Sequence, residues 1–152
     1  MSHPNIPVAG LPEGFQPLQR GGGFLRSLGP WYYRRDAKGQ MVLAIRIDDR
    51  HTNTRHIAHG GFLVTMLDTA LGIVVSSSRE PAQPIVTVSL TTNFVASASP
   101  GDWVEARVDI DRIGGRLAYA SCTLVAGDRT IMTGSGVFAL MKPVTPREQP
   151  DG

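Results

Sequence analysis

The second half of the chain alternates apolar and polar side chains, and few folds satisfy that pattern. In residues 86–94 and 104–111 almost every second side chain is apolar, and two more strand-like runs follow at 116–125 and 130–140. A period of two is typical of strands with one buried face. The runs are linked by short segments rich in Gly and Asp, whereas parallel strands need a crossover of a dozen or more residues. We therefore expect consecutive antiparallel strands.

The first half contributes one hairpin and one long helix. Residues 28–35 and 41–47 are strand-like and flank a turn signal at 36–39, in which Gly supplies a positive φ. After a polar loop at 48–58, the run 60–76 is apolar without alternation and long enough to favour a helix. A hairpin, a helix and then consecutive strands predict an α+β fold, with the helix packed on one face of an antiparallel sheet.

Composition indicates a single globular domain. The chain has 152 residues, of which 41% are hydrophobic and 18% charged. Its net charge of +2 is too balanced for a protein that neutralises nucleic-acid phosphates. The single cysteine, Cys122, excludes an intrachain disulfide and fits a reducing compartment. No run approaches the roughly 20 apolar residues that span a bilayer, and the N-terminus does not resemble a signal peptide. We therefore expect a cytoplasmic protein that binds neither nucleic acid nor membrane.

Prolines crowd both ends of the sequence, within the first seventeen residues and within the last ten. Such composition is typical of irregular arms. The sequence is therefore divided into an irregular N-terminal arm at 1–20, a domain at 21–141 and a Pro-rich tail at 142–152.

The predicted helix carries a single ionisable side chain, Asp68. At 100° per residue, small or polar side chains share one stripe with it, and apolar side chains cover most of the remaining surface. A helix that is apolar most of the way round is buried, so Asp68 is expected in or beside the interior. A buried carboxylate is costly unless it has a use or a partner. Asp68 is therefore either a catalytic base or a carboxylate that hydrogen-bonds the backbone or threonines in a polar seam.

His59, Gly60 and Gly61 stand at the start of this helix. Glycines allow a substrate to approach the backbone closely. The free N–H groups of the first helical turn, together with the helix dipole, stabilise developing negative charge. The helix start is therefore a candidate oxyanion site.

Together these residues resemble the signature of the hotdog-fold acyl-CoA thioesterases, specifically the phenylacetyl-CoA thioesterase (PaaI-like) branch. The spacing of Asn53, His59-Gly60-Gly61 and Asp68-Thr69-Ala70 carries the resemblance, which extends over roughly residues 28–140. In that family a curved antiparallel sheet wraps a long central helix, and active sites form between two subunits. The resemblance implies a homodimer at minimum, and favours a homotetramer. It also implies an acyl-CoA substrate and no separate cofactor.

The resemblance assigns catalytic roles to four residues. The N–H of Gly60 binds the thioester carbonyl, and Asn53 orients the carbonyl or a water molecule. Asp68 comes from the facing subunit as nucleophile or general base. Thr87 falls at the position of a hydroxyl that helps hold the water.

Substrate binding is assigned to four further residues. His59 and Gly61 flank the carbonyl site, although His59 is favoured as a structural residue at the helix start over an acid–base group. Arg112 and Arg116 are candidates for the phosphates of coenzyme A, because the Arg fork suits phosphate; solvated arginines at strand ends remain the alternative.

Several other signals are weaker. His51, His56 and His59, with Asp48 and Asp49 nearby, lack metal-ligand spacing, so no metal site is expected. Gly21-Gly22-Gly23 completes no phosphate-binding fingerprint, and the run at 133–136 is not a serine-hydrolase elbow. Cys122 is expected to be a packed core thiol.

The sequence therefore predicts hydrolysis of an acyl-CoA to free acid and coenzyme A. An aryl, arylacetyl or medium-chain acyl group in an apolar tunnel is expected. Two alternatives stay open: a non-catalytic acyl-CoA-binding module on the same fold, and an enoyl-CoA hydratase.

Overall fold

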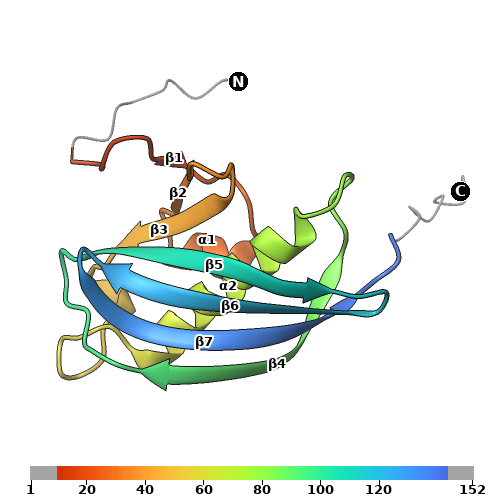
Figure 1. The fold of residues 1–152 in the computed structure, drawn as a ribbon. Coiled ribbons are helices and arrows are strands. Elements are labelled where there is room, and N and C mark those ends of the chain that lie inside the picture. The colour runs from red at the N-terminus through yellow and green to blue at the C-terminus, as the bar shows by residue number, and fades with distance from the viewer. Residues whose placement is uncertain (1–9, 144–152) are drawn as a thin grey trace, which may run out of the picture.

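The computed structural model describes residues 10–143, and Figure 1 shows their arrangement. The expected arm and tail extend beyond this range at 1–9 and 144–152, which lie outside the described residues. In chain order the elements are β1 (Gln16–Pro17), α1 (Gly23–Leu28), β2 (Tyr32–Arg35), β3 (Met41–Arg46), a 3₁₀ turn (Asp49–His51), α2 (Gly60–Ser76), β4 (Ile85–Phe94), β5 (Trp103–Ile113), β6 (Leu117–Ala126) and β7 (Arg129–Leu140).

The seven strands form one antiparallel sheet in the order β1-β2-β3-β5-β6-β7-β4. The sheet curves around α2, which lies behind it in Figure 1 and packs against β3, β4, β5, β6 and β7. The predicted α+β fold, a long helix wrapped by a curved antiparallel sheet, is confirmed. Within residues 10–143 no helix is long and apolar enough to cross a membrane.

Two glycines of β7 let α2 approach the sheet closely. A Cβ atom at Gly134 would lie 2.8 Å from Leu67 Cδ1 and 2.8 Å from the backbone oxygen of Thr91. At Gly136 a Cβ atom would lie 3.1 Å from Leu71 Cδ1. Leu67 and Leu71 are fully buried and face these strand positions from α2. The Gly-Ser-Gly run therefore serves helix–sheet packing.

We expect Gly134→Ala to lower the free energy of unfolding by about 1–3 kcal/mol, because overpacking a close contact forces backbone shifts. The backbone oxygen of Thr91 belongs to a paired strand and cannot turn away as a flexible side chain would. Denaturant unfolding at fixed protein concentration measures the change. Ser135→Ala is the matched control, since Ser135 is exposed on the same strand. Equal stability of Gly134→Ala and the control would contradict this account of the contact.

The N-terminal segment differs from the sequence prediction. A strand was expected to begin at residue 28. Instead, Leu28 is the last residue of α1, and β2 starts only at Tyr32. Pro30 has no N–H to donate to a neighbouring strand, and the Trp31 indole instead donates to the Leu25 backbone oxygen at 2.7 Å. In addition, β1 pairs with β2, although no strand was predicted there.

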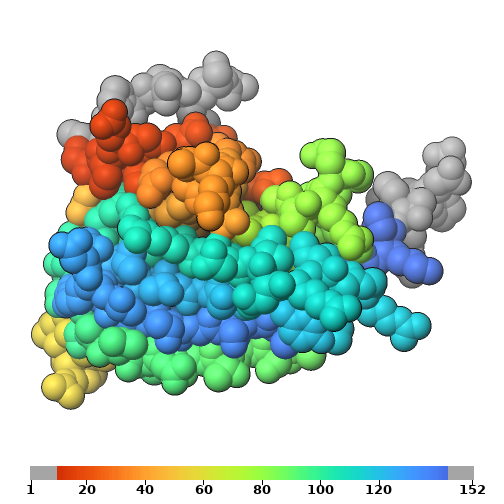
Figure 2. Space-filling model, in the orientation of Figure 1, coloured from red at the N-terminus to blue at the C-terminus, as the bar shows by residue number. Residues whose placement is uncertain are grey.

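Strand β4 forms one edge of the sheet, and within residues 10–143 it pairs with β7 alone. It is ten residues long, and Figure 2 shows it as the green lower margin of the molecule. Val86, Val88 and Phe94 on this strand are each more than half exposed, as is Val95 just after it. A long apolar edge strand is a template for pairing with another chain.

Candidate active site

Asp68 is held by a hydrogen bond between α2 and β4. Thr87 Oγ1 donates to Asp68 Oδ1 at 2.7 Å. Asp68 is half-buried, Thr87 is exposed, and both line an open cavity of 340 Å³. The other carboxylate oxygen of Asp68 has no hydrogen-bond partner among residues 10–143. One oxygen is therefore fixed, while the other is free to act on a group bound in the cavity.

A β-bulge turns Thr87 toward the helix. Thr87 lies opposite the buried Phe138 of β7, whereas Ser89 lies opposite Val137, so residue 88 is the additional one. An extra residue shifts the side chains beyond it to the opposite face of the sheet. Before the bulge Thr87 faces α2, and after it Leu90 does. Without the bulge, strict alternation from residue 86 would place Thr87 and Leu90 on opposite faces of the sheet.

The start of α2 carries an unpaired amide. His59 is the N-cap, and its Nδ1 accepts the N–H of Gly61 at 2.9 Å. The N–H of Gly60 has no hydrogen-bond partner among the described residues. A Cβ atom on Gly60 would lie 3.3 Å from the Phe94 ring at the end of β4. A free donor thus stands at the positive end of the helix dipole, beside an exposed aromatic ring.

Asn53 belongs to the loop that leads into this helix start. An isolated bridge between Thr52 and Ala58 closes the loop. Asn53 Oδ1 accepts the N–H of Arg55 at 2.9 Å, and its own N–H donates to Ile57 O at 2.9 Å. Asn53 Nδ2 donates to no other residue within 10–143. The side-chain amide is therefore oriented and keeps a free donor.

The structure separates these residues into two groups. Asn53, His59, Gly60 and Gly61 lie at the first turn of α2, whereas Asp68 and Thr87 lie farther along it. Asp68 comes eight positions after Gly60, which is about 12 Å along the helix axis at about 1.5 Å per residue. Atoms that act on one carbonyl must lie within about 3 Å of it. The two groups of one chain therefore cannot act on the same thioester.

Arg112 and Arg116 lie together at the β5–β6 turn, where both line a hollow of 580 Å³. Leu117 and Tyr119, which line it too, are exposed, whereas Ala118 between them is buried in the core. The hollow is therefore on the sheet face away from α2. A bulge between residues 110 and 112 places Arg112 opposite Tyr119. Within one chain, neither arginine reaches the Asp68 cavity.

An arginine that the sequence analysis did not select, Arg20, does line the Asp68–Thr87 cavity. It lies in the range 1–20 that was expected to be an irregular arm. The only sequence signal near it is Gly21-Gly22-Gly23. Gly21 has a φ of +108°, and a Cβ atom there would lie 2.5 Å from Leu25 Cδ2. The glycine run therefore shapes the turn into α1 and sets the position of Arg20.

The remaining candidate residues have structural surroundings. Burial, together with the negative charge of nearby Asp109, raises the pKa of the Cys122 thiol to about 12. This thiol is therefore protonated at neutral pH, as expected of a packed core residue. His51 is buried; its Nδ1 accepts the Asp48 N–H, and its Nε2 lies 2.6 Å from Leu28 O. Across residues 10–143, no three His, Cys, Asp or Glu side chains gather in a possible metal site.

The long helix, its wrapping sheet and the polar groups along the helix define the hotdog class of thioesterases. Residues 56–133 match the family model of the thioesterase superfamily. The chain belongs to this superfamily, which confirms the prediction of a thioester hydrolase.

Three curated relatives show the range of similarity. A Pseudomonas aeruginosa protein that bears the provisional name of an esterase is 48% identical over 130 residues, which is 86% of this chain and 97% of that protein. Human acyl-coenzyme A thioesterase 13 is 24% identical over 114 residues, covering 75% of this chain and 81% of the relative. A 3-hydroxybutyryl-CoA dehydratase of Methylorubrum extorquens is 33% identical over 88 residues, 57% of this chain and 53% of that enzyme.

Two solved structures share the fold. The PaaI protein from the phenylacetic acid degradation operon of E. coli superposes with a TM-score of 0.70 at 18% identity, over 81% of this chain and 87% of its own. A Bacillus halodurans protein crystallised with CoA gives a TM-score of 0.68 at 22% identity, over 74% of each chain.

Proposed function

We propose that this protein is an acyl-CoA thioesterase that hydrolyses an acyl-CoA to the free acid and coenzyme A. The observation that carries the proposal is the Thr87–Asp68 hydrogen bond of 2.7 Å, which fixes a carboxylate in an open cavity. The name of the human relative and the CoA bound to the Bacillus structure support the choice of substrate.

Two subunits are needed to complete the site. If two copies pair through their exposed β4 edges around a two-fold axis near Leu90, the Phe94 end of one strand meets the Thr87 end of the other. Phe94 lies beside the free amide of Gly60, and Thr87 binds Asp68. This pairing brings the amide of one subunit to the carboxylate of its partner and buries the apolar edge. It supports a homodimer at minimum, with a homotetramer as the larger assembly.

The thioester is hydrolysed by groups with distinct roles. The Gly60 N–H donates to the carbonyl oxygen and stabilises the negative charge that develops on it. Asn53 Nδ2 assists at the same oxygen or at water. Asp68 of the facing subunit takes a proton from the attacking water, or attacks the carbonyl carbon itself. When Asp68 acts as a base, water adds to the carbonyl carbon, the carbon–sulfur bond breaks, and the proton taken from water passes to the sulfur, so that coenzyme A leaves as the thiol. When Asp68 attacks instead, coenzyme A leaves as the thiolate and is protonated by water, and a second step hydrolyses the mixed anhydride that Asp68 forms with the acyl group. Thr87 donates to Asp68, so its role is to orient the carboxylate, and its oxygen can still accept from water.

We propose Arg112 and Arg116 as the residues that bind the phosphates of coenzyme A. Leu117 pairs with Ala139, and Ala139 pairs with Val86. The arginine hollow therefore lies about two strand spacings, or about 10 Å, from the β4 end that carries Thr87. An extended cofactor tail can cover that distance along the sheet edge.

The proposal is tested by thiol release from acetyl-, hexanoyl-, benzoyl-, hydroxybenzoyl- and phenylacetyl-CoA. Release of thiol supports a thioesterase. Binding of these ligands without release would indicate the binding module instead. Loss of the enoyl absorbance of a conjugated enoyl-CoA, without thiol release, would indicate a hydratase, which the dehydratase relative makes a specific alternative.

We expect Gly60→Pro to lower kcat by about 10²–10³, because it removes one oxyanion donor. Proline is favoured at the first position of a helix, and His59 has φ −62° and ψ 134°, which a following proline tolerates. Circular dichroism should therefore show an unchanged helix. Gly60→Ala is the control, since it adds a Cβ atom and keeps the N–H. If both variants have the same kcat, the Gly60 amide is not the donor.

A further inference from the structure

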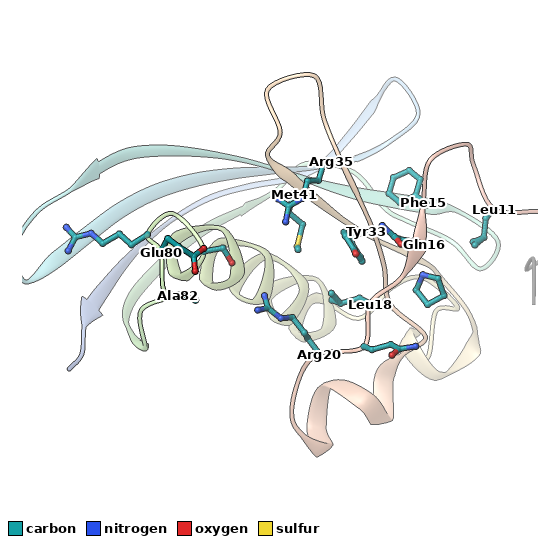
Figure 3. Close-up of a pocket in the computed structure, with 14 residues that line it drawn as sticks. Leu11, Phe15, Gln16, Leu18, Arg20, Tyr33, Arg35, Met41, Glu80 and Ala82 are labelled. Atoms are coloured by element: carbon teal, nitrogen blue, oxygen red, sulfur yellow. The ribbon is translucent and has the colours of Figure 1, made fainter. Parts of the chain in front are cut away.

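A second cavity adjoins the Asp68–Thr87 cavity. It measures 880 Å³ and lies between residues 11–20, the hairpin of β2 and β3, and the segment 77–82 after α2 (Figure 3). Arg20 lines both cavities. In Figure 3 its side chain extends from the segment before α1 toward α2. Arg20 therefore lies at the border between the two cavities.

The wall of the larger cavity does not suit a plain hydrocarbon. Phe15, Leu18 and Met41 give it an apolar part. Three arginines and one glutamate also line it, so the charged side chains of the wall sum to +2. Covering such groups with a hydrocarbon chain removes them from water without compensation. The wall fits an acyl group with a short apolar body and an anionic end.

Arg20 is the arginine of this wall that is free to bind such an end. Arg35 donates to the backbone oxygen of Gly39 at 3.0 Å, and Arg79 to that of Gly114 at 3.4 Å. Arg20 makes no hydrogen bond or ion pair with any other residue in 10–143. A guanidinium is a planar fork that matches a carboxylate with two parallel hydrogen bonds. Glu80 lines the same cavity, but no ion pair joins it to Arg20 within residues 10–143.

We propose that the acyl group extends from Asp68 toward the larger cavity and that Arg20, at the border of the two cavities, binds a carboxylate at the far end of the acyl chain. The substrate class is thus an acyl-CoA whose acyl chain ends in a carboxylate. This inference rests on the proposed thioesterase function. In place of the expected apolar tunnel, it gives the acyl group a site with both apolar side chains and the cationic Arg20.

The test compares glutaryl-CoA with 5-methylhexanoyl-CoA, in which an isopropyl group replaces the carboxylate at similar size. The readout is the ratio of their kcat/KM values, measured by thiol release. The wild type should prefer glutaryl-CoA. In Arg20→Gln the ratio should fall by about 10- to 100-fold, as expected for loss of a hydrogen bond between charged groups. The matched control is Arg107→Gln, the same change at an exposed arginine that pairs with Glu105 on β5.

The outcomes separate this inference from the proposed function. An unchanged ratio in Arg20→Gln, or a wild type that prefers 5-methylhexanoyl-CoA, overturns the role of Arg20 while thioesterase activity stands. An equal fall in Arg107→Gln would show a general effect of charge and would also overturn it. Absence of thiol release from both substrates and from the wider panel rejects the proposed function together with this inference.

Discussion

Asp68→Asn should lower kcat by at least about 100-fold and leave the fold intact, because removal of a positioned base costs about 10²–10⁴ in rate. Asparagine has nearly the same shape, and its Oδ1 can still accept the hydroxyl of Thr87, which donates to Asp68 in the structure. The bond between α2 and β4 is therefore kept, while the basic and nucleophilic oxygen is lost. Thiol release under saturating acyl-CoA measures the effect.

Asp128→Asn provides the control for this substitution. Asp128 lies in the β6–β7 turn and is exposed, so the same change there should alter neither rate nor stability. Circular dichroism and denaturant unfolding of both variants establish that any loss of rate is chemical. If Asp68→Asn hydrolyses acyl-CoA at the wild-type rate, Asp68 is neither base nor nucleophile, and the polar-seam interpretation of this residue stands in its place.

The regular part of the fold could be predicted because its pattern is local. The helix has the predicted bounds of residues 60 and 76, since a long apolar run without alternation suits only a buried helix. The hairpin of β6 and β7 follows from alternation and from Gly127, whose φ is +60°. The hydrophobic period and the turn residues are properties of neighbouring positions, so one sequence is enough to read them.

Near a bulge, the side of the sheet on which each strand side chain lies could not be predicted. Alternation from residue 86 implies that Val86 and Val88 face the core, yet both are more than half exposed. The bulge between Thr87 and Ser89 reverses the phase and turns Thr87 toward Asp68. A bulge depends on the pairing of two strands distant in sequence, and a single strand does not reveal it.

The position of Arg20 at the Asp68–Thr87 cavity was missed for a related reason. The segment around Arg20 has no hydrophobic periodicity, because it follows the surface of other elements of the fold. The cavity that Arg20 lines is made by residues from both halves of the chain, including Met41 and Ala82. Only the assembled structure brings them together.

A mixture of Asp68→Asn and Gly60→Pro should regain activity that neither variant has alone. In the proposed two-fold dimer each site takes Gly60 from one subunit and Asp68 from the other. A mixed dimer then holds one intact site and one site with both defects. If subunits combine at random from equal amounts, half of the dimers are mixed, so about one quarter of the wild-type activity should return. The variants are unfolded together, refolded and assayed for thiol release.

Each variant refolded alone, and wild type treated in the same way, are the controls, and differently tagged subunits verify that mixed dimers form. If Asp68 and Gly60 of one chain served the same site, every site in a mixed dimer would be defective and no activity would return. The separation of about 12 Å along α2 opposes that arrangement. Mixed dimers without activity would therefore contradict the shared site, even if both residues prove essential singly. A recovery near one quarter requires the partner's Asp68 to act on the carbonyl held by Gly60.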